Sequence, residues 1–197
     1  MSINAKYRRI TFEELTRFQA DPDTTINVFF GIDKYEQYVA MDIPDEENFD
    51  EDAFLNTPSP VDDPERRLDI ENEWQAVHFL LTEEFAFPGQ SRVPPPLSDV
   101  VMGGTVISTI DVGYGPPRYL IPDEVHNVSA TLAQMDFEEL GRRFDVAAYN
   151  KVGGYPKLRS KGWVQEDVAP IVETALLLKD FYHAASKNGD AMLLWAD

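Results

Sequence analysis

The stretch DVGYGPPRYLIPDEV (residues 111–125) combines residue types that could hold an anion. Gly113 and Gly115 allow positive φ, and the two prolines that follow fix φ at about −65°. A stiff loop of this kind would lead from a strand into a helix, present Tyr114 at its tip, and offer the planar guanidinium of Arg118 to a carboxylate or phosphate. The structural alternative is that Tyr114 packs against the protein and Arg118 pairs with an acid. The sequence favours this alternative.

A tryptophan and a histidine follow one another at helical spacing. Trp74 and His78 are four residues apart, so a helix would place them on the same side. His78 stands between Val77 and Phe79 and is expected to be half-buried, either as a neutral imidazole bonded to a carbonyl or as a general base. A ligand cleft would require His78 and Arg118 to converge on one concave pocket.

Signatures of catalysis and of metal binding are absent from the sequence. There is no cysteine, which excludes thiolate nucleophiles and sulfur ligands, and the histidines do not occur as HxxxH or HExxH. There is no G-x-S-x-G, S-x-x-K, Walker or G-x-G-x-x-G pattern, and the prolines of GYGPP remove amide donors that a phosphate loop needs. We therefore expect no catalytic residue, no metal and no cofactor.

Acidic residues dominate the segment from 42 to 73. The net charge of the chain is −18, and this segment, with thirteen acids and two bases, carries eleven of those charges. Prolines interrupt it, so we interpret residues 43–65 as a long acidic surface loop. Such a charge repels nucleic acids and anionic membranes and suits a basic protein partner. The residues expected to contact that partner are Phe49, Asp50, Glu51, Asp52 and Phe54.

Length and periodicity predict one domain of the α+β, or loosely α/β, class. A chain of 197 residues suits a single domain. Strands are expected over residues 104–110 and 191–196, while 26–30 could be a strand or a helix. We expect a single compact, mainly helical domain with a small mixed β-sheet. Its helices are predicted over residues 11–20, 69–82, 122–135, 136–144 and 166–187.

No segment of the sequence indicates export or membrane insertion. The N-terminus lacks the apolar stretch of a signal peptide, and no run approaches the ~18 apolar residues of a membrane helix. The cytoplasm is therefore the expected location. The oligomeric state is open between monomer and homodimer.

Several separate motifs together resemble one known family. They are YRRITFEELTRF, LDIENEWQAVHFLLT, the pair Gly103-Gly104, GYGPPRYLIPDEV, the turn Tyr155-Pro156 and FYHAASKNGDAMLLW. Taken in this order they resemble the YfbM-like family of bacterial proteins, domain of unknown function 1877. The resemblance implies a single compact α+β domain in a cytoplasmic bacterial or phage protein. The family carries no agreed activity, so no catalytic residue is transferred, and the acidic segment 43–65 is longer than the family pattern needs.

Two functions of different classes fit these observations. The first, which the sequence favours, is a non-enzymatic, immunity-like binding protein that occupies a basic partner through its acidic loop. The alternative is a small-ligand receptor or an enzyme with a cleft near Tyr114 and Arg118, to which His78 and Trp74 would contribute.

Overall fold

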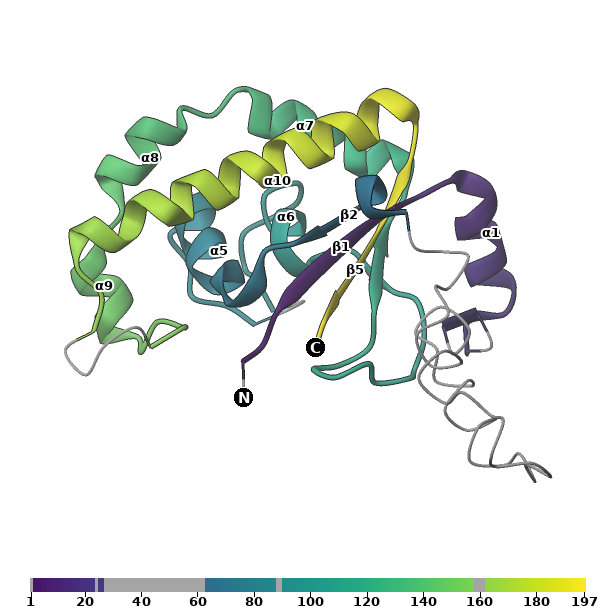
Figure 1. Ribbon diagram of the computed structural model, residues 1–197, viewed down its shortest axis with the longest axis horizontal. Coiled ribbons are helices and arrows are strands. Elements are labelled where there is room, and N and C mark those ends of the chain that lie inside the picture. The colour runs from purple at the N-terminus through teal and green to yellow at the C-terminus, as the bar shows by residue number, and fades with distance from the viewer. Residues whose placement is uncertain (1, 24, 27–62, 88–89, 158–161) are drawn as a thin grey trace, which may run out of the picture.

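The computed structural model describes residues 2–23, 25–26, 63–87, 90–157 and 162–197. Within these residues the chain forms a five-stranded sheet with helices packed against it (Figure 1). The strands lie in the order β2-β1-β5-β4-β3, and every neighbouring pair is antiparallel. The mainly helical α+β class predicted from the sequence is confirmed. The sheet is antiparallel throughout, where a mixed sheet was expected.

Two long strands form the middle of the sheet. β1 (Ala5–Ile10) and β5 (Ala191–Ala196) pair over six residues each. All residues of β5 are buried, because a strand lies on each side of it and both faces of the sheet are covered. Backbone bonds between Asn4 and Asp197 (2.8 and 3.1 Å) extend the pairing, so the two ends of the chain lie close together (Figure 1). The strand predicted over residues 191–196 is confirmed.

Three short strands complete the sheet. β2 (Arg67–Asp69) pairs with the outer side of β1, while β4 (Arg118–Leu120) and β3 (Thr105–Val106) lie beyond β5. Strands of two or three residues are too short to show the alternation of apolar and polar residues by which a strand is recognised in a sequence. The strand predicted over 104–110 is correct only for residues 105–106. The chain then turns, and the hydroxyl of Ser108 accepts a backbone N–H there (3.0 Å).

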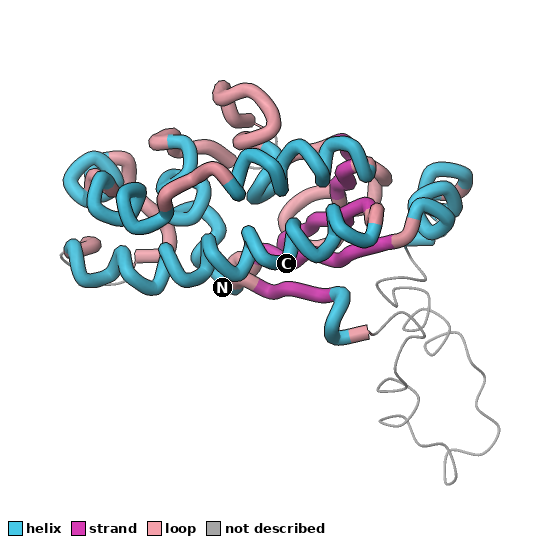
Figure 2. Tube along the Cα trace, turned by 90° about the horizontal axis from the view of Figure 1, so that it is seen from above, coloured by secondary structure: helices cyan, strands magenta, loops and turns pink. Residues whose placement is uncertain are grey.

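A layer of helices covers one face of the sheet. α10 (Val168–Asn188) is the longest of the described helices, and α7 (Pro122–Ala133) and α8 (Phe137–Arg143) lie along it (Figure 1). α1 (Phe12–Ala20) lies apart from this layer, at the far end of the molecule in both views (Figures 1 and 2). The other described helices are α5 (Trp74–Thr82), α6 (Asp99–Met102) and α9 (Val146–Lys151), with 3₁₀ turns at Pro64–Arg66, Glu71–Glu73 and Gln165–Asp167.

Most helix ends follow local signals in the sequence. Thr11 and Glu14 form the expected capping box, in which each side chain accepts the backbone N–H of the other (3.1 and 2.6 Å). Asp136 caps α8 through the N–H of Glu139 (3.0 Å), and Gly189 ends α10 at a φ of +71°. Four predicted helices are confirmed to within two residues at each end, namely those over 11–20, 122–135, 136–144 and 166–187.

The helix predicted from Asp69 begins later, at Trp74. Asp69 ends β2, and its Oδ1 accepts the N–H of Glu71 at 2.7 Å. Glu71 has a φ of +50°, which an α-helix excludes, so α5 begins only after it, and the 3₁₀ turn Glu71–Glu73 lies between β2 and α5. Of the ambiguous run 26–30, only Ile26 lies within the described residues, and it is buried.

The main core lies between the sheet and the helical layer, and a smaller cluster covers the other face of the sheet. Tyr7 on β1 and Tyr182 on α10 are fully buried at the centre, and their rings meet edge to face with centroids 6.5 Å apart. The Tyr7 hydroxyl donates to the carbonyl of Val101 (2.7 Å), and the Tyr182 hydroxyl donates to that of Val100 (3.0 Å). These bonds satisfy carbonyls of α6 and tie this short helix to the sheet and to α10.

Candidate functional site

A cavity of about 170 Å³ lies where α5, α6 and the start of β4 meet. One part of its wall is apolar, and the other part carries an arginine, a buried carboxyl group and an imidazole. Segments far apart in the sequence therefore contribute to one concave surface. The residues that line it are Trp74, His78, Ala86, Phe87, Ser91, Ser98, Asp99, Val101, Met102, Gly103, Gly104 and Arg118.

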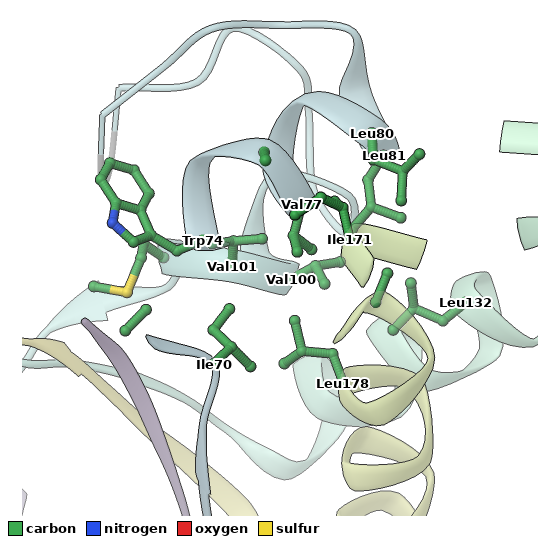
Figure 3. Packing of buried hydrophobic residues seen from close by; sticks show 14 of the residues in the cluster. Ile70, Trp74, Val77, Leu80, Leu81, Val100, Val101, Leu132, Ile171 and Leu178 are labelled. Atoms are coloured by element: carbon green, nitrogen blue, oxygen red, sulfur yellow. The ribbon is translucent and has the colours of Figure 1, made fainter. Parts of the chain in front are cut away.

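Helix α5 serves both the core and the cavity. Val77 points into the packed cluster between α5, α6 and α10, whereas Trp74 lies at the edge of that cluster (Figure 3). The indole of Trp74 is only 3% exposed, and its Nε1–H donates to the carbonyl of Ile3 at 3.2 Å. Its ring also lies against Tyr155, with centroids 5.9 Å apart. Trp74 is thus a fixed wall of the cavity.

His78 lies one turn after Trp74 and is more deeply buried than expected, at 5% exposure. Its Nε2 is enclosed, has no hydrogen-bond partner in the described part of the chain, and lies 4.0 Å from Glu84 Oε2. Burial lowers the pKa of His78 from its ordinary value, and the carboxylate of Glu84 opposes this effect only in part. The ring is therefore neutral at pH 7 and adds no positive charge to the cavity.

Protonation of His78 is expected to lower stability at acid pH. Its pKa in the folded state lies below the ordinary value of 6.5, so the unfolded chain takes up the proton first as the pH falls. The contribution of the neutral ring is complete above pH 6.5 and is lost as the pH falls from there toward the folded-state pKa. In denaturant titrations at a series of pH values, His78→Gln should give a flatter dependence of the unfolding free energy below pH 6.5 than the wild type.

The control for this measurement is His126→Gln, which removes an exposed histidine of α7 that is hydrogen-bonded to Ser186. A flattening of equal size in both variants would show that the effect is not specific to the buried ring. Identical curves for the wild type and His78→Gln would show that burial of this ring does not affect its titration.

Arg118 begins β4 and does not belong to the preceding loop. Its Nε–H donates to the carbonyl of Gly103 (3.1 Å), and its Nη2 donates to that of Gly104 (2.7 Å). Partial burial lowers the pKa of the guanidinium while Asp99 opposes this, yet an arginine stays charged at any physiological pH. The ion pair with an acid that the sequence favours for this residue does not form among the described residues, where Arg118 instead donates to two backbone carbonyls.

The loop before β4 holds Tyr114 away from the cavity. Asp111 Oδ1 accepts the N–H groups of Gly113 (2.8 Å) and Gly115 (2.9 Å), and the N–H of Tyr114 donates to the carbonyl of Ala196 (3.0 Å). The side chain of Tyr114 is 41% exposed and is not among the residues that line the cavity. Of the four residues predicted to bind a ligand, the cavity brings together the other three, Trp74, His78 and Arg118.

Asp99 is a cavity residue that the sequence did not reveal. It begins α6, is 9% exposed, and its Oδ1 accepts the N–H of Gly104 at 3.1 Å. Gly104 has a φ of +79°, and a Cβ there would lie 2.3 Å from the carbonyl oxygen of Tyr119. The glycine pair was the available signal, since adjacent glycines mark places where the backbone approaches another group closely.

The residues predicted to contact a protein partner, Phe49, Asp50, Glu51, Asp52 and Phe54, lie outside the described residues. Of the acidic segment 43–65, the structure describes residues 63–65 alone. That hypothesis therefore stays a prediction.

Two kinds of feature are absent from the described residues. No helix among them combines the length and the apolar character that crossing a membrane requires. No group of three or more histidine, aspartate or glutamate side chains in this part of the chain could hold a metal ion.

Comparison with known proteins identifies a family and a fold. The family model described as "Domain of unknown function (DUF1877)" matches residues 1–195. The fold is similar to the crystal structure of a protein of unknown function, YfbM from Escherichia coli, with a TM-score of 0.63 and 19% sequence identity over 100% of both chains. No curated protein matches the chain. At this level of identity the structural similarity shows the fold alone.

Proposed function

Because the chain belongs to the DUF1877 family, whose description names no activity, we propose a function from the cavity alone. The domain binds a small molecule that carries a carboxylate group, and it holds this molecule between α5 and β4. The observation that carries the proposal is the convergence of Trp74, His78 and Arg118 on one cavity.

Arg118 has the hydrogen-bonding capacity that a carboxylate requires. A guanidinium has five N–H donors, and two of them are used on the carbonyls of Gly103 and Gly104. The bonds to these carbonyls fix the orientation of the group without neutralising its charge. The other donors have no acceptor among the described residues, so a planar carboxylate can bind there with both of its oxygens.

The volume of the cavity suits a small ligand. Its volume of about 170 Å³ equals that of roughly five or six molecules of liquid water. Trp74, Phe87 and Met102 supply apolar contact area, as is usual in ligand pockets in which a few polar groups fix the orientation. The expected ligand is therefore a short carboxylic acid with an apolar body.

Binding without covalent chemistry fits the side chains better than catalysis does. The hydroxyl of Ser91 donates to Glu84 Oε2 at 2.6 Å and not to His78. This hydrogen bond and those from backbone N–H groups lower the pKa of Glu84, which makes its carboxylate a weak base for activating a nucleophile. The Nε2 of His78 is enclosed and therefore cannot reach a ligand. We accordingly assign His78 to the wall of the cavity.

The test is calorimetric titration of the whole chain with short carboxylates, such as 3-methylbutanoate, 4-methylpentanoate and benzoate. At least one of them should bind saturably at a single site. Arg118→Gln, which keeps an amide donor but removes the charge, should weaken binding by about tenfold or more, because a hydrogen bond to a charged group contributes about 1.5–3 kcal/mol.

The matched control is Arg142→Gln on α8, which makes the same change of charge outside the cavity. It should leave affinity unchanged within about twofold. The proposal fails if none of the carboxylates binds the wild type, or if the two variants weaken binding equally.

A further inference from the structure

We propose that the ligand of this cavity is a zwitterion, namely a small α-amino acid with an apolar side chain. Its carboxylate would bind Arg118 and its ammonium group would bind Asp99. This inference rests on the proposed function and adds a second charge to the ligand.

Asp99 and Arg118 carry opposite charges at one cavity but do not pair with each other. Asp99 is 9% exposed, its Oδ1 accepts the N–H of Gly104, and its Oδ2 receives no hydrogen bond from the described residues. Arg118 likewise keeps N–H donors without an acceptor in this part of the chain. Partly desolvated charges of opposite sign gain most from direct pairing. Two such charges that form no ion pair with each other fit a ligand that brings a partner for each.

Gly103 and Gly104 bind both charged groups. Their carbonyls accept from Arg118, and the N–H of Gly104 donates to Asp99, so both side chains are fixed on the same short piece of backbone. A Cβ on Gly103 would lie 2.3 Å from Asp99 Oδ1, and one on Gly104 would lie 2.3 Å from Tyr119 O. Because neither position has room for a side chain, the placement of both charged groups depends on glycine at these two positions.

The rest of the wall limits the remainder of the ligand. His78 is buried and Trp74, Val101 and Met102 are apolar, so no further charge faces this part of the cavity. A cavity of about 170 Å³ has room for roughly six to nine non-hydrogen atoms, since about five or six waters would fill it. Alanine, valine, leucine and methionine are within this range.

The experiment is calorimetric titration of the whole chain with these four amino acids and with their deaminated acids: propanoate, 3-methylbutanoate, 4-methylpentanoate and 4-(methylsulfanyl)butanoate. At least one amino acid should bind about tenfold or more tightly than its deaminated acid, as a hydrogen bond between two charged groups would give. If the deaminated acids bind and no amino acid binds more tightly than its deaminated acid, the inference of a zwitterionic ligand is wrong while the proposed function stands. If neither class binds, both are wrong.

Asp99→Asn separates recognition of the ammonium group from a structural role. Asparagine keeps the size of the side chain and an oxygen for the N–H of Gly104, but it removes the charge. In this variant the preference for the amino acid over its deaminated acid should fall to within about twofold. An equal loss of affinity for both ligands would overturn the inference. The control Asp123→Asn, at the start of α7 and outside the cavity, should keep the full preference.

Discussion

A Gly104→Ala variant is expected to lose about 3–5 kcal/mol of unfolding free energy, the sum of backbone strain and of an overpacked contact. The strain arises because Gly104 has a φ of +79°, and the contact arises because the new Cβ would lie 2.3 Å from the carbonyl oxygen of Tyr119. Tyr119 pairs with Thr105, so relief of the clash would separate β3 from β4. It would also move the carbonyl that holds Arg118.

Gly153→Ala is a closely matched control for this change. Gly153 has a φ of +78°, and a Cβ built there meets nothing within 4 Å. This variant should lose about 1–2 kcal/mol of unfolding free energy, because it adds only the strain of a left-handed backbone conformation. Both variants can be measured by denaturant unfolding, with the midpoint and the slope compared. Equal losses of unfolding free energy in the two variants would show that the close approach of Gly104 to Tyr119 does not add to the destabilisation.

Trp74→Ala is expected to lose about 3–5 kcal/mol of unfolding free energy, as is usual for deletion of a large buried ring. Trp74 is 3% exposed, donates to the carbonyl of Ile3 and lies against Tyr155. The deletion removes these contacts and opens the cavity toward the N-terminal segment. Denaturant unfolding measures the loss of stability, and ligand titration measures the accompanying loss of affinity.

Phe87→Ala provides the comparison on the same cavity. Phe87 also lines it but is 52% exposed, so its truncation should cost less than about 1 kcal/mol. A small loss for Trp74→Ala, similar to that for Phe87→Ala, would mean that the cavity wall is not rigid. It would remove the basis for a site of fixed shape.

The helices could be predicted where their end signals are local, as at Thr11 and Glu14 of α1. β1 could not be predicted from the sequence, because it lies inside the sheet, between β2 and β5, and yet carries three basic residues. Arg9 is neutralised by Asp190 at 2.9 Å and Lys6 by Asp197 at 2.7 Å, partners from the other end of the chain. A strand whose charges are compensated by distant partners does not look like a buried strand in the sequence.

The candidate site could be predicted as residue types but not as an arrangement. Trp74 and His78 share a helix face that the sequence shows directly. Their convergence with Arg118 depends on the pairing of β4 with β5 and on the attachment of α6 to the core, and neither is a local property. Asp99 is one of 35 acidic residues, and the nearby pair Gly103-Gly104 indicates a close approach of the backbone without indicating which acid it contacts.

The most direct test of a ligand site beside Trp74 is a titration followed by the indole N–H signals in a ¹H–¹⁵N NMR spectrum. The chain has three tryptophans. Trp163 lies in an aromatic cluster with Phe144 and Tyr149, and Trp195 lies on the opposite face of the sheet. Addition of 4-methylpentanoate or leucine should shift the Trp74 signal saturably and leave the other two in place. A Trp74 signal that does not move at any ligand concentration, or a larger saturable shift at Trp163, would contradict this location.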